Sequence, residues 1–131
     1  MNQWVLGAWV AAGSALGGLL RFTVSGLVAR FVGETFPFGT LTVNVTGSFL
    51  IGLVAALSAP EGRWMIAPEI RLFLMLGIFG GFTTFSSFSL QTLSLVQDGE
   101  WVAAFLNIVG SVALCLIAVW IGWAAGWSLN R

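Results

Sequence analysis

Four long runs without a charged residue divide this 131-residue chain. A helix needs about 20 mostly apolar residues to cross the hydrocarbon core of a bilayer, and each run is about that long or longer. Together the runs use nearly the whole chain, so no soluble domain fits in what remains. They are Asn2–Leu20, Thr35–Pro60, Leu72–Gln97 and Trp101–Asn130.

The composition leads to the same class of protein. Hydrophobic residues make up 58% of the chain and charged residues only 8%, whereas about 25% of residues are charged in soluble domains. We therefore expect an all-α membrane protein with one four-helix transmembrane domain over residues 1–131. The sequence predicts helices at about 3–32, 38–58, 68–97 and 101–127, joined by short connections.

The third run contains a segment that forms a poor continuous helix. Gly77–Phe88 holds three glycines, two adjacent threonines and two serines, with phenylalanines between them. A glycine costs about 1 kcal/mol relative to alanine inside a helix, and unpaired backbone groups in hydrocarbon cost several kcal/mol each. The sequence therefore predicts a third helix broken in mid-membrane, a feature typical of an ion or substrate site.

The charged residues exclude several classes of function. The chain has five arginines, five acids, one cysteine and no histidine, and its net charge is zero. Proton-coupled transporters need a titratable group in the membrane, and hydrolases and metalloenzymes need a nucleophile with a base or a ligand cluster. We therefore expect neither an enzyme nor a nucleic-acid-binding protein.

Arg21 is the one charge that interrupts an apolar stretch. Its side chain can extend to the membrane surface from near a helix end. Alternatively, it attracts an anion into a vestibule or holds a helix break. The sequence leaves both interpretations open.

The arginines give only a weak orientation signal. With four crossings, Arg63, Arg71 and Arg131 lie on one side, and Arg30 lies on the other with Arg21 inside the first helix. So small a bias permits insertion in both orientations, or a single orientation that the charges set only loosely.

Polar residues follow one face of the second predicted helix. Thr40, Asn44 and Ser48 are spaced four residues apart, so they share a face that must meet protein or water. They form hydrogen bonds between helices or face an anion path, where the Asn44 NH2 group is a suitable donor. Asn107 and Ser111 repeat this spacing in the last helix.

Two phenylalanines follow the predicted break. Phe85 and Phe88 are three residues apart and lie on one helical face. Aromatic rings have a positive edge, so the pair either packs in a core or stabilises a small anion. Gly122 and Gly126 form a GxxxG pattern, which is a helix-packing signal.

Three motifs in this order resemble those of the Fluc family of small fluoride channels, and the resemblance covers essentially the whole chain. Gly17–Phe22 is similar to the family's glycine-rich signature ending in arginine, and Gly39–Phe49 is similar to its second-helix motif. Gly80–Phe88 resembles the family's GGxTTFSxF signature. The resemblance implies a passive channel that exports F− across the cell (inner) membrane.

The resemblance also implies an assembly and a set of site residues. It implies an antiparallel, dual-topology homodimer with two pores, and a structural Na+ bound by the Gly80 and Thr83 carbonyls. Phe85 and Phe88 would line the path, with a polar track beside them and a basic residue near its vestibule. With the polar face included, the expected path residues are Arg21, Thr40, Asn44, Phe85, Ser86, Ser87, Phe88, Asn107 and Ser111.

Two positions depart from the family pattern. Family members usually have a glutamate three residues after the second phenylalanine, where this chain has Gln91. No carboxylate role is possible there. Phe22 stands where a tyrosine is common, so any contact through a hydroxyl is lost.

Two other functions remain alternatives. A small dual-topology multidrug-type exporter also has four short helices, but it requires a membrane-embedded carboxylate, and the runs contain none. A non-transporting assembly subunit would account for the small-residue faces, but not for the polar faces and the helix break.

Overall fold

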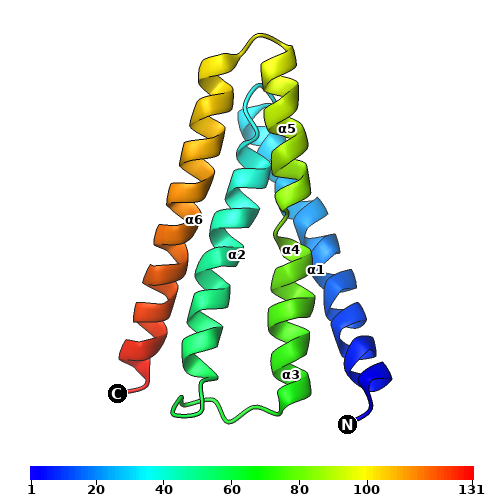
Figure 1. The fold of residues 1–131 in the computed structure, drawn as a ribbon, viewed down its shortest axis with the longest axis vertical. Coiled ribbons are helices and arrows are strands. Elements are labelled where there is room, and N and C mark those ends of the chain that lie inside the picture. The colour runs from blue at the N-terminus through cyan, green and yellow to red at the C-terminus, as the bar shows by residue number, and fades with distance from the viewer.

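A computed structural model describes all residues, 1–131, and every regular element in it is helical. Four helical spans are long and apolar enough to cross a membrane, as predicted. Both termini lie at one end of the molecule, and the connections after the first and third spans lie at the other (Figure 1). The spans are α1 (Gln3–Val32), α2 (Phe38–Leu57), a composite third span (Pro68–Gln97) and α6 (Trp101–Leu129).

The third span is broken, as the sequence predicts. Thr83 and Thr84 adopt extended backbone conformations, with φ/ψ of −87°/160° and −154°/118°. Residues before and after this pair are helical. The span consists of α3 (Pro68–Leu72), the π-helix η1 (Phe73–Phe79), α4 (Gly80–Phe82) and, after the break, α5 (Phe85–Gln97).

The glycines before the break have a role that their helix propensity does not indicate. Gly77 and Gly81 are helical and lie against the backbone of α1, at Gly13 and Ser14 respectively. A Cβ atom at Gly17 would overlap the carbonyl of Ile78. These glycines allow two backbones to approach closely, and the threonines after them carry the break.

A second close helix pair joins α2 and α6. Added Cβ atoms at Gly122 and Gly126 would meet the backbone of α2, at Phe49 and Leu53 respectively. This contact confirms the packing role expected for the GxxxG pattern, since small residues let membrane helices approach. The pair is the most extensive helix contact in the molecule.

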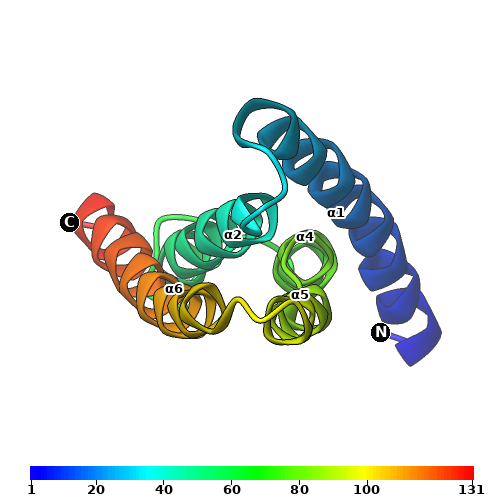
Figure 2. The same cartoon turned by 90° about the horizontal axis from the view of Figure 1, so that it is seen from above.

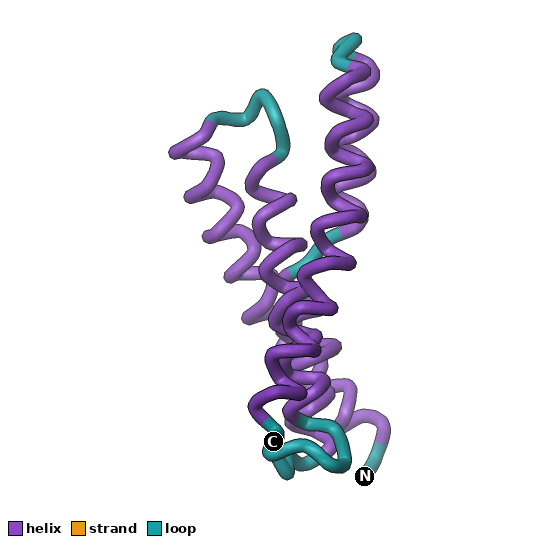
Figure 3. Tube along the Cα trace, turned by 90° about the vertical axis from the view of Figure 1, so that its left-hand side faces the viewer, coloured by secondary structure: helices purple, strands orange, loops and turns teal.

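The break changes the direction of the third span. Before it, α4 and η1 pack on α1; after it, α5 packs on α6 and touches α2 but makes no contact with α1. The view from above shows α1 leaning away from the other helices (Figure 2). From the side, the connected ends of α1 and α2 diverge from the connected ends of α5 and α6 (Figure 3). The two parts of the third span therefore have different helical neighbours.

Candidate functional site

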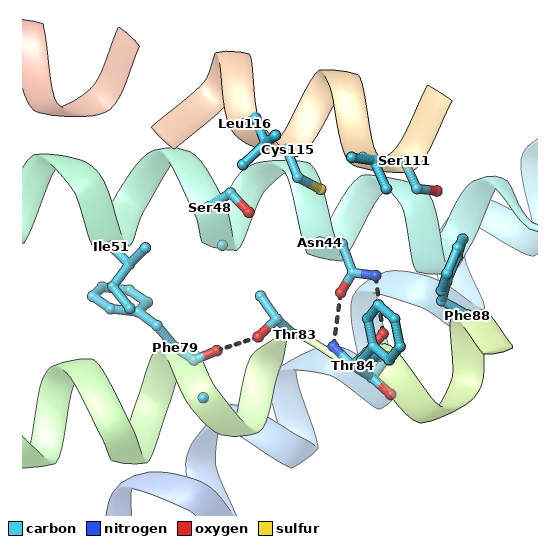
Figure 4. Close-up of a pocket in the computed structure, with 14 residues that line it drawn as sticks. Asn44, Ser48, Ile51, Phe79, Thr83, Thr84, Phe88, Ser111, Cys115 and Leu116 are labelled. Carbon is cyan, nitrogen blue, oxygen red and sulfur yellow. Dashed lines mark hydrogen bonds between the residues drawn. The ribbon is translucent and has the colours of Figure 1, made fainter. Parts of the chain in front are cut away.

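A cavity of about 360 Å³ lies beside the break, between α2, α5 and α6. Asn44 enters it from α2, Thr83 from the break, Phe88 from α5, and Ser111 from α6 (Figure 4). Phe85 of α5 also lines it. No charged side chain lines the cavity. Its lining is therefore a mixture of neutral hydrogen-bonding groups and aromatic rings.

Asn44 is bound to the backbone of the break by both ends of its amide. Its Nδ2 donates to the Thr84 carbonyl at 3.0 Å, and its Oδ1 accepts from the Thr84 N–H at 2.7 Å (Figure 4). In a continuous helix the Thr84 N–H would donate to the Gly80 carbonyl. The side chain of Asn44 thus replaces a helical partner that the break removes.

Thr84 also caps the helix that follows. Its Oγ1 accepts from the Ser87 N–H at 3.1 Å and lies 3.3 Å from the Ser86 hydroxyl. A threonine that accepts from the third residue of a helix is a favoured N-cap. Ser86 and Ser87 therefore adjoin the break through Thr84 and are not part of the cavity lining.

Arg21 reaches the break from α1. Its guanidinium donates to the Thr83 carbonyl at 3.3 Å, and no carboxylate lies within ion-pair distance of it. A guanidinium has five N–H donors, and only this one forms a hydrogen bond within the chain. Of the two roles left open by the sequence, contact with the break is the one that the structure contains.

Phe85 and Phe88 differ in their surroundings. Their ring centroids are 5.3 Å apart and the planes are inclined by 51°. Phe88 is 9% exposed, whereas Phe85 is 76% exposed on the side of the bundle. One ring is thus held by its neighbours, and the other stands at an open face.

Asn107 belongs to a buried hydrogen-bond network between α5 and α6. It is 2% exposed, and its Nδ2 donates to the Thr92 hydroxyl at 2.9 Å. Ser111 donates to its Oδ1 at 3.3 Å. Ser111 lines the cavity but Asn107 does not, so of these two hydrogen-bonded residues only Ser111 reaches the cavity.

A second cavity, of about 780 Å³, opens at the end where α1 joins α2 and α5 joins α6. Thr40 and Gln91 line it, together with the three acidic residues Glu34, Asp98 and Glu100. Oε1 of Gln91 is buried without a hydrogen-bond partner. Thr40 therefore lies apart from Asn44, although both share one face of α2.

The expected site residues thus gather in part. Several other cavity residues were not among the expected site residues, and Thr84 and Cys115 are two of them. Thr84 was identifiable as a capping residue three positions before Ser87, and Cys115 as a neighbour of Ser111 on one helical face. The expected residues that line the first cavity are Asn44, Gly80, Thr83, Phe85, Phe88 and Ser111.

Comparisons with known proteins give consistent matches. Residues 8–123 match the family described as "CrcB-like protein, Camphor Resistance (CrcB)". A "Fluoride-specific ion channel FluC" from Opitutus terrae is 59% identical over 122 residues, covering 93% of this chain and 92% of the relative. Proteins of the same name from Paramagnetospirillum magneticum and Rhodospirillum rubrum are 58% and 51% identical, and each comparison covers at least 94% of both chains.

Proposed function

Because this chain belongs to the CrcB-like family, whose similar members are named fluoride-specific ion channels, we propose that it is a fluoride channel that exports F− passively. The family is one of ion channels, so the protein is not an enzyme. Its four apolar spans make it a multi-pass protein of the bacterial inner membrane.

The uncharged cavity beside the break is the observation that best supports conduction of a small anion. A conducting site must favour entry without holding the ion too tightly. A cationic lining would bind F− strongly, but this cavity has amide, hydroxyl and aromatic side chains instead. Aromatic edges carry partial positive charge, so Phe85 and Phe88 are suited to a dehydrated anion.

The other path residues divide into four groups by position. Asn44 offers its second N–H inside the first cavity, and Ser111, whose O–H donates to Asn107, lines the same cavity. Ser86 and Ser87 adjoin it through Thr84 and form the polar track. Thr40 lines the wider second cavity. The last group, Arg21 and Asn107, acts from outside both cavities.

We propose that the active form is an antiparallel homodimer. Phe85, Ser86 and Gly80 are all exposed on the side of this bundle. Lipid cannot supply hydrogen bonds to a broken polar segment, and a second copy would cover it. The weak arginine bias is compatible with insertion in both orientations. A monomeric mass by light scattering in mild detergent would contradict the dimer.

A structural Na+ held by the Gly80 and Thr83 carbonyls fits the carbonyl oxygens available at the break. The Gly80 carbonyl lacks its usual helical donor, since the Thr84 N–H binds Asn44. The Thr83 carbonyl accepts from Arg21 but has a second lone pair. No group of three His, Cys, Asp or Glu side chains could hold a metal, whereas unwound carbonyls coordinate Na+ in other membrane proteins.

Removal of Na+ tests this assignment without measuring conduction. When bound, the ion would supply positive charge between the two copies. We expect the melting temperature of the purified protein to fall by several degrees when N-methylglucamine replaces Na+. An equal melting temperature in both buffers would contradict a structural Na+.

The export direction follows from acid–base chemistry. Neutral HF crosses lipid and dissociates in a less acidic cytoplasm, where F− accumulates. A passive anion pore then lets F− leave down its gradient. The channel needs no coupled ion and no membrane-embedded carboxylate, which distinguishes it from the exporter alternative.

Anion efflux from liposomes containing only the purified protein tests the function. We expect rapid release of F− and little release of Cl−, and a decrease of at least about tenfold in F− efflux for Phe85→Ile or Phe88→Ile. Phe31→Ile, at an exposed position outside both cavities, is the control. Equal F− and Cl− release would contradict selectivity, and no release would favour the assembly-subunit alternative.

A further inference from the structure

We propose that Asn44 is the positioning residue of the break: its side-chain amide sets the Thr84 backbone, and through it the start of α5. The inference rests on the proposed function only for what α5 then presents to the anion. The hydrogen bonds themselves do not depend on that function.

The geometry resembles backbone pairing between two strands. The Asn44 amide presents one donor and one acceptor to the same residue, at 3.0 Å and 2.7 Å. Thr84 has an extended backbone and is 8% exposed. Its N–H and carbonyl therefore need partners inside the protein, and no other side chain bonds to either atom.

Thr84 links this contact to the site. Because Thr84 caps α5, its position relative to α2 determines where α5 begins. Phe85 follows directly, and Phe88 lies one turn later on the same face. Asn44 thus acts on the aromatic pair through the backbone, in addition to facing the cavity with its remaining N–H.

Ser48 provides a matched contrast. It lies one turn further along α2 and lines the same cavity, but its hydroxyl forms no hydrogen bond within the chain. If the polar lining alone mattered, Asn44 and Ser48 would act alike on the break. If Asn44 positions the break, only its substitution will release the Thr84 N–H.

Amide hydrogen exchange at Thr84 tests the proposal. The full-length protein, labelled with 15N-threonine in lipid nanodiscs, is compared with the Asn44→Ala, Asn44→Asp and Ser48→Ala variants. We expect exchange at Thr84 to accelerate about tenfold or more in Asn44→Ala and to stay unchanged in Ser48→Ala. The Thr92 amide, which lies within α5, should remain slow in all of them.

Asn44→Asp keeps the test decisive if Asn44→Ala does not fold. A carboxylate still accepts from the Thr84 N–H but cannot donate to the Thr84 carbonyl. Exchange at Thr84 should therefore stay within about threefold of the wild-type rate. Fast exchange at Thr84 in Asn44→Asp, or unchanged slow exchange in a folded Asn44→Ala, would overturn the proposal.

Fluoride efflux measured on the same samples separates this inference from the proposed function. We expect Asn44→Ala to lower F− efflux by about tenfold or more. If the wild-type protein releases no F− but the Thr84 amide still exchanges fast in Asn44→Ala, the channel function is contradicted. The positioning role of Asn44 then stands. Efficient wild-type efflux with a protected Thr84 in Asn44→Ala would contradict the positioning role alone.

Discussion

The two halves of the third span are held in the bundle by different means. Before the break, Gly77 and Gly81 lie directly against the backbone of α1. After it, α5 leaves α1, and side chains from other helices secure the break itself. The first half is fixed by close backbone contact, and the start of the second by hydrogen bonds from Asn44 and Arg21.

The difference separates two uses of small and polar residues in a membrane. Glycines allow two helix backbones to approach so closely that no side-chain atom fits between them. Serine, threonine, asparagine and arginine hold a backbone that has lost its helical partners. A substitution in the first half should therefore affect assembly of the bundle, and one near the second half should affect the site.

The largest effect should come from filling the contact before the break. In Gly17→Val, the added side chain would overlap the Ile78 carbonyl, and overpacking of this kind costs at least about 1–3 kcal/mol. We expect loss of the monodisperse peak in size-exclusion chromatography.

The adjacent glycine supplies the control for this contact. A Cβ atom at Gly18 meets nothing within 4 Å. Gly18→Ala should therefore leave folding intact or improve it slightly, since alanine is the better helix former. An equal loss of the monodisperse peak in Gly17→Val and Gly18→Ala would contradict the view that close backbone contact holds the first half of the span.

A smaller effect, on conduction, should follow removal of the arginine contact. Arg21→Gln deletes the cationic donor to the Thr83 carbonyl, and hydrogen bonds to charged groups contribute about 1.5–3 kcal/mol. We expect F− efflux to fall by about tenfold or more while the protein remains folded. Arg30→Gln, at an exposed position away from the break, should conduct normally, and equal loss in both would show that net charge alone matters.

A still smaller effect is expected from the buried network that joins α5 to α6. Asn107→Leu removes the partner of Thr92 and Ser111, and such bonds in membranes average about 0.6 kcal/mol. We expect a loss of about 1 kcal/mol in the free energy of unfolding, measured by equilibrium denaturation in detergent. A loss of conduction without any loss of stability would instead show that Asn107 acts on the anion directly and not through the network between α5 and α6.

The smallest effect should occur at Gln91. Its Oε1 is buried without a donor, and removal of an unpaired polar group is nearly neutral or stabilising. Gln91→Met should therefore change the free energy of unfolding by less than about 0.5 kcal/mol. A loss comparable to that of Asn107→Leu would reveal a hydrogen bond to Gln91 that this fold does not contain.

The sequence predicts the spans well because membrane thickness limits helix length. The four helices follow from apolar length, and the packing role of Gly122 and Gly126 follows from small-residue spacing. The choice of α2 as their partner helix does not follow from the sequence. The position of the break does not follow. Glycine weakens any helix, yet Gly77 and Gly81 remain helical, because close contact with α1 compensates for their poor propensity.

The site is less predictable because its partners are distant in sequence. Periodicity places Asn44 on a polar face, but Thr84 lies 40 residues further along the chain. The same holds for Arg21 and Thr83, which are 62 residues apart. Asn107 and Ser111 share a helical face, yet the cavity reaches only Ser111, since the position of α5 decides which of them is covered.

Both termini lie at one end of the molecule (Figure 1), and this makes membrane orientation measurable. A protease site fused to either terminus reports the same face of the bilayer. In sealed vesicles, a population inserted in both directions would lose about half of its tags to external protease. A population with one orientation would lose all of them or none, so a single gel would distinguish the two arrangements.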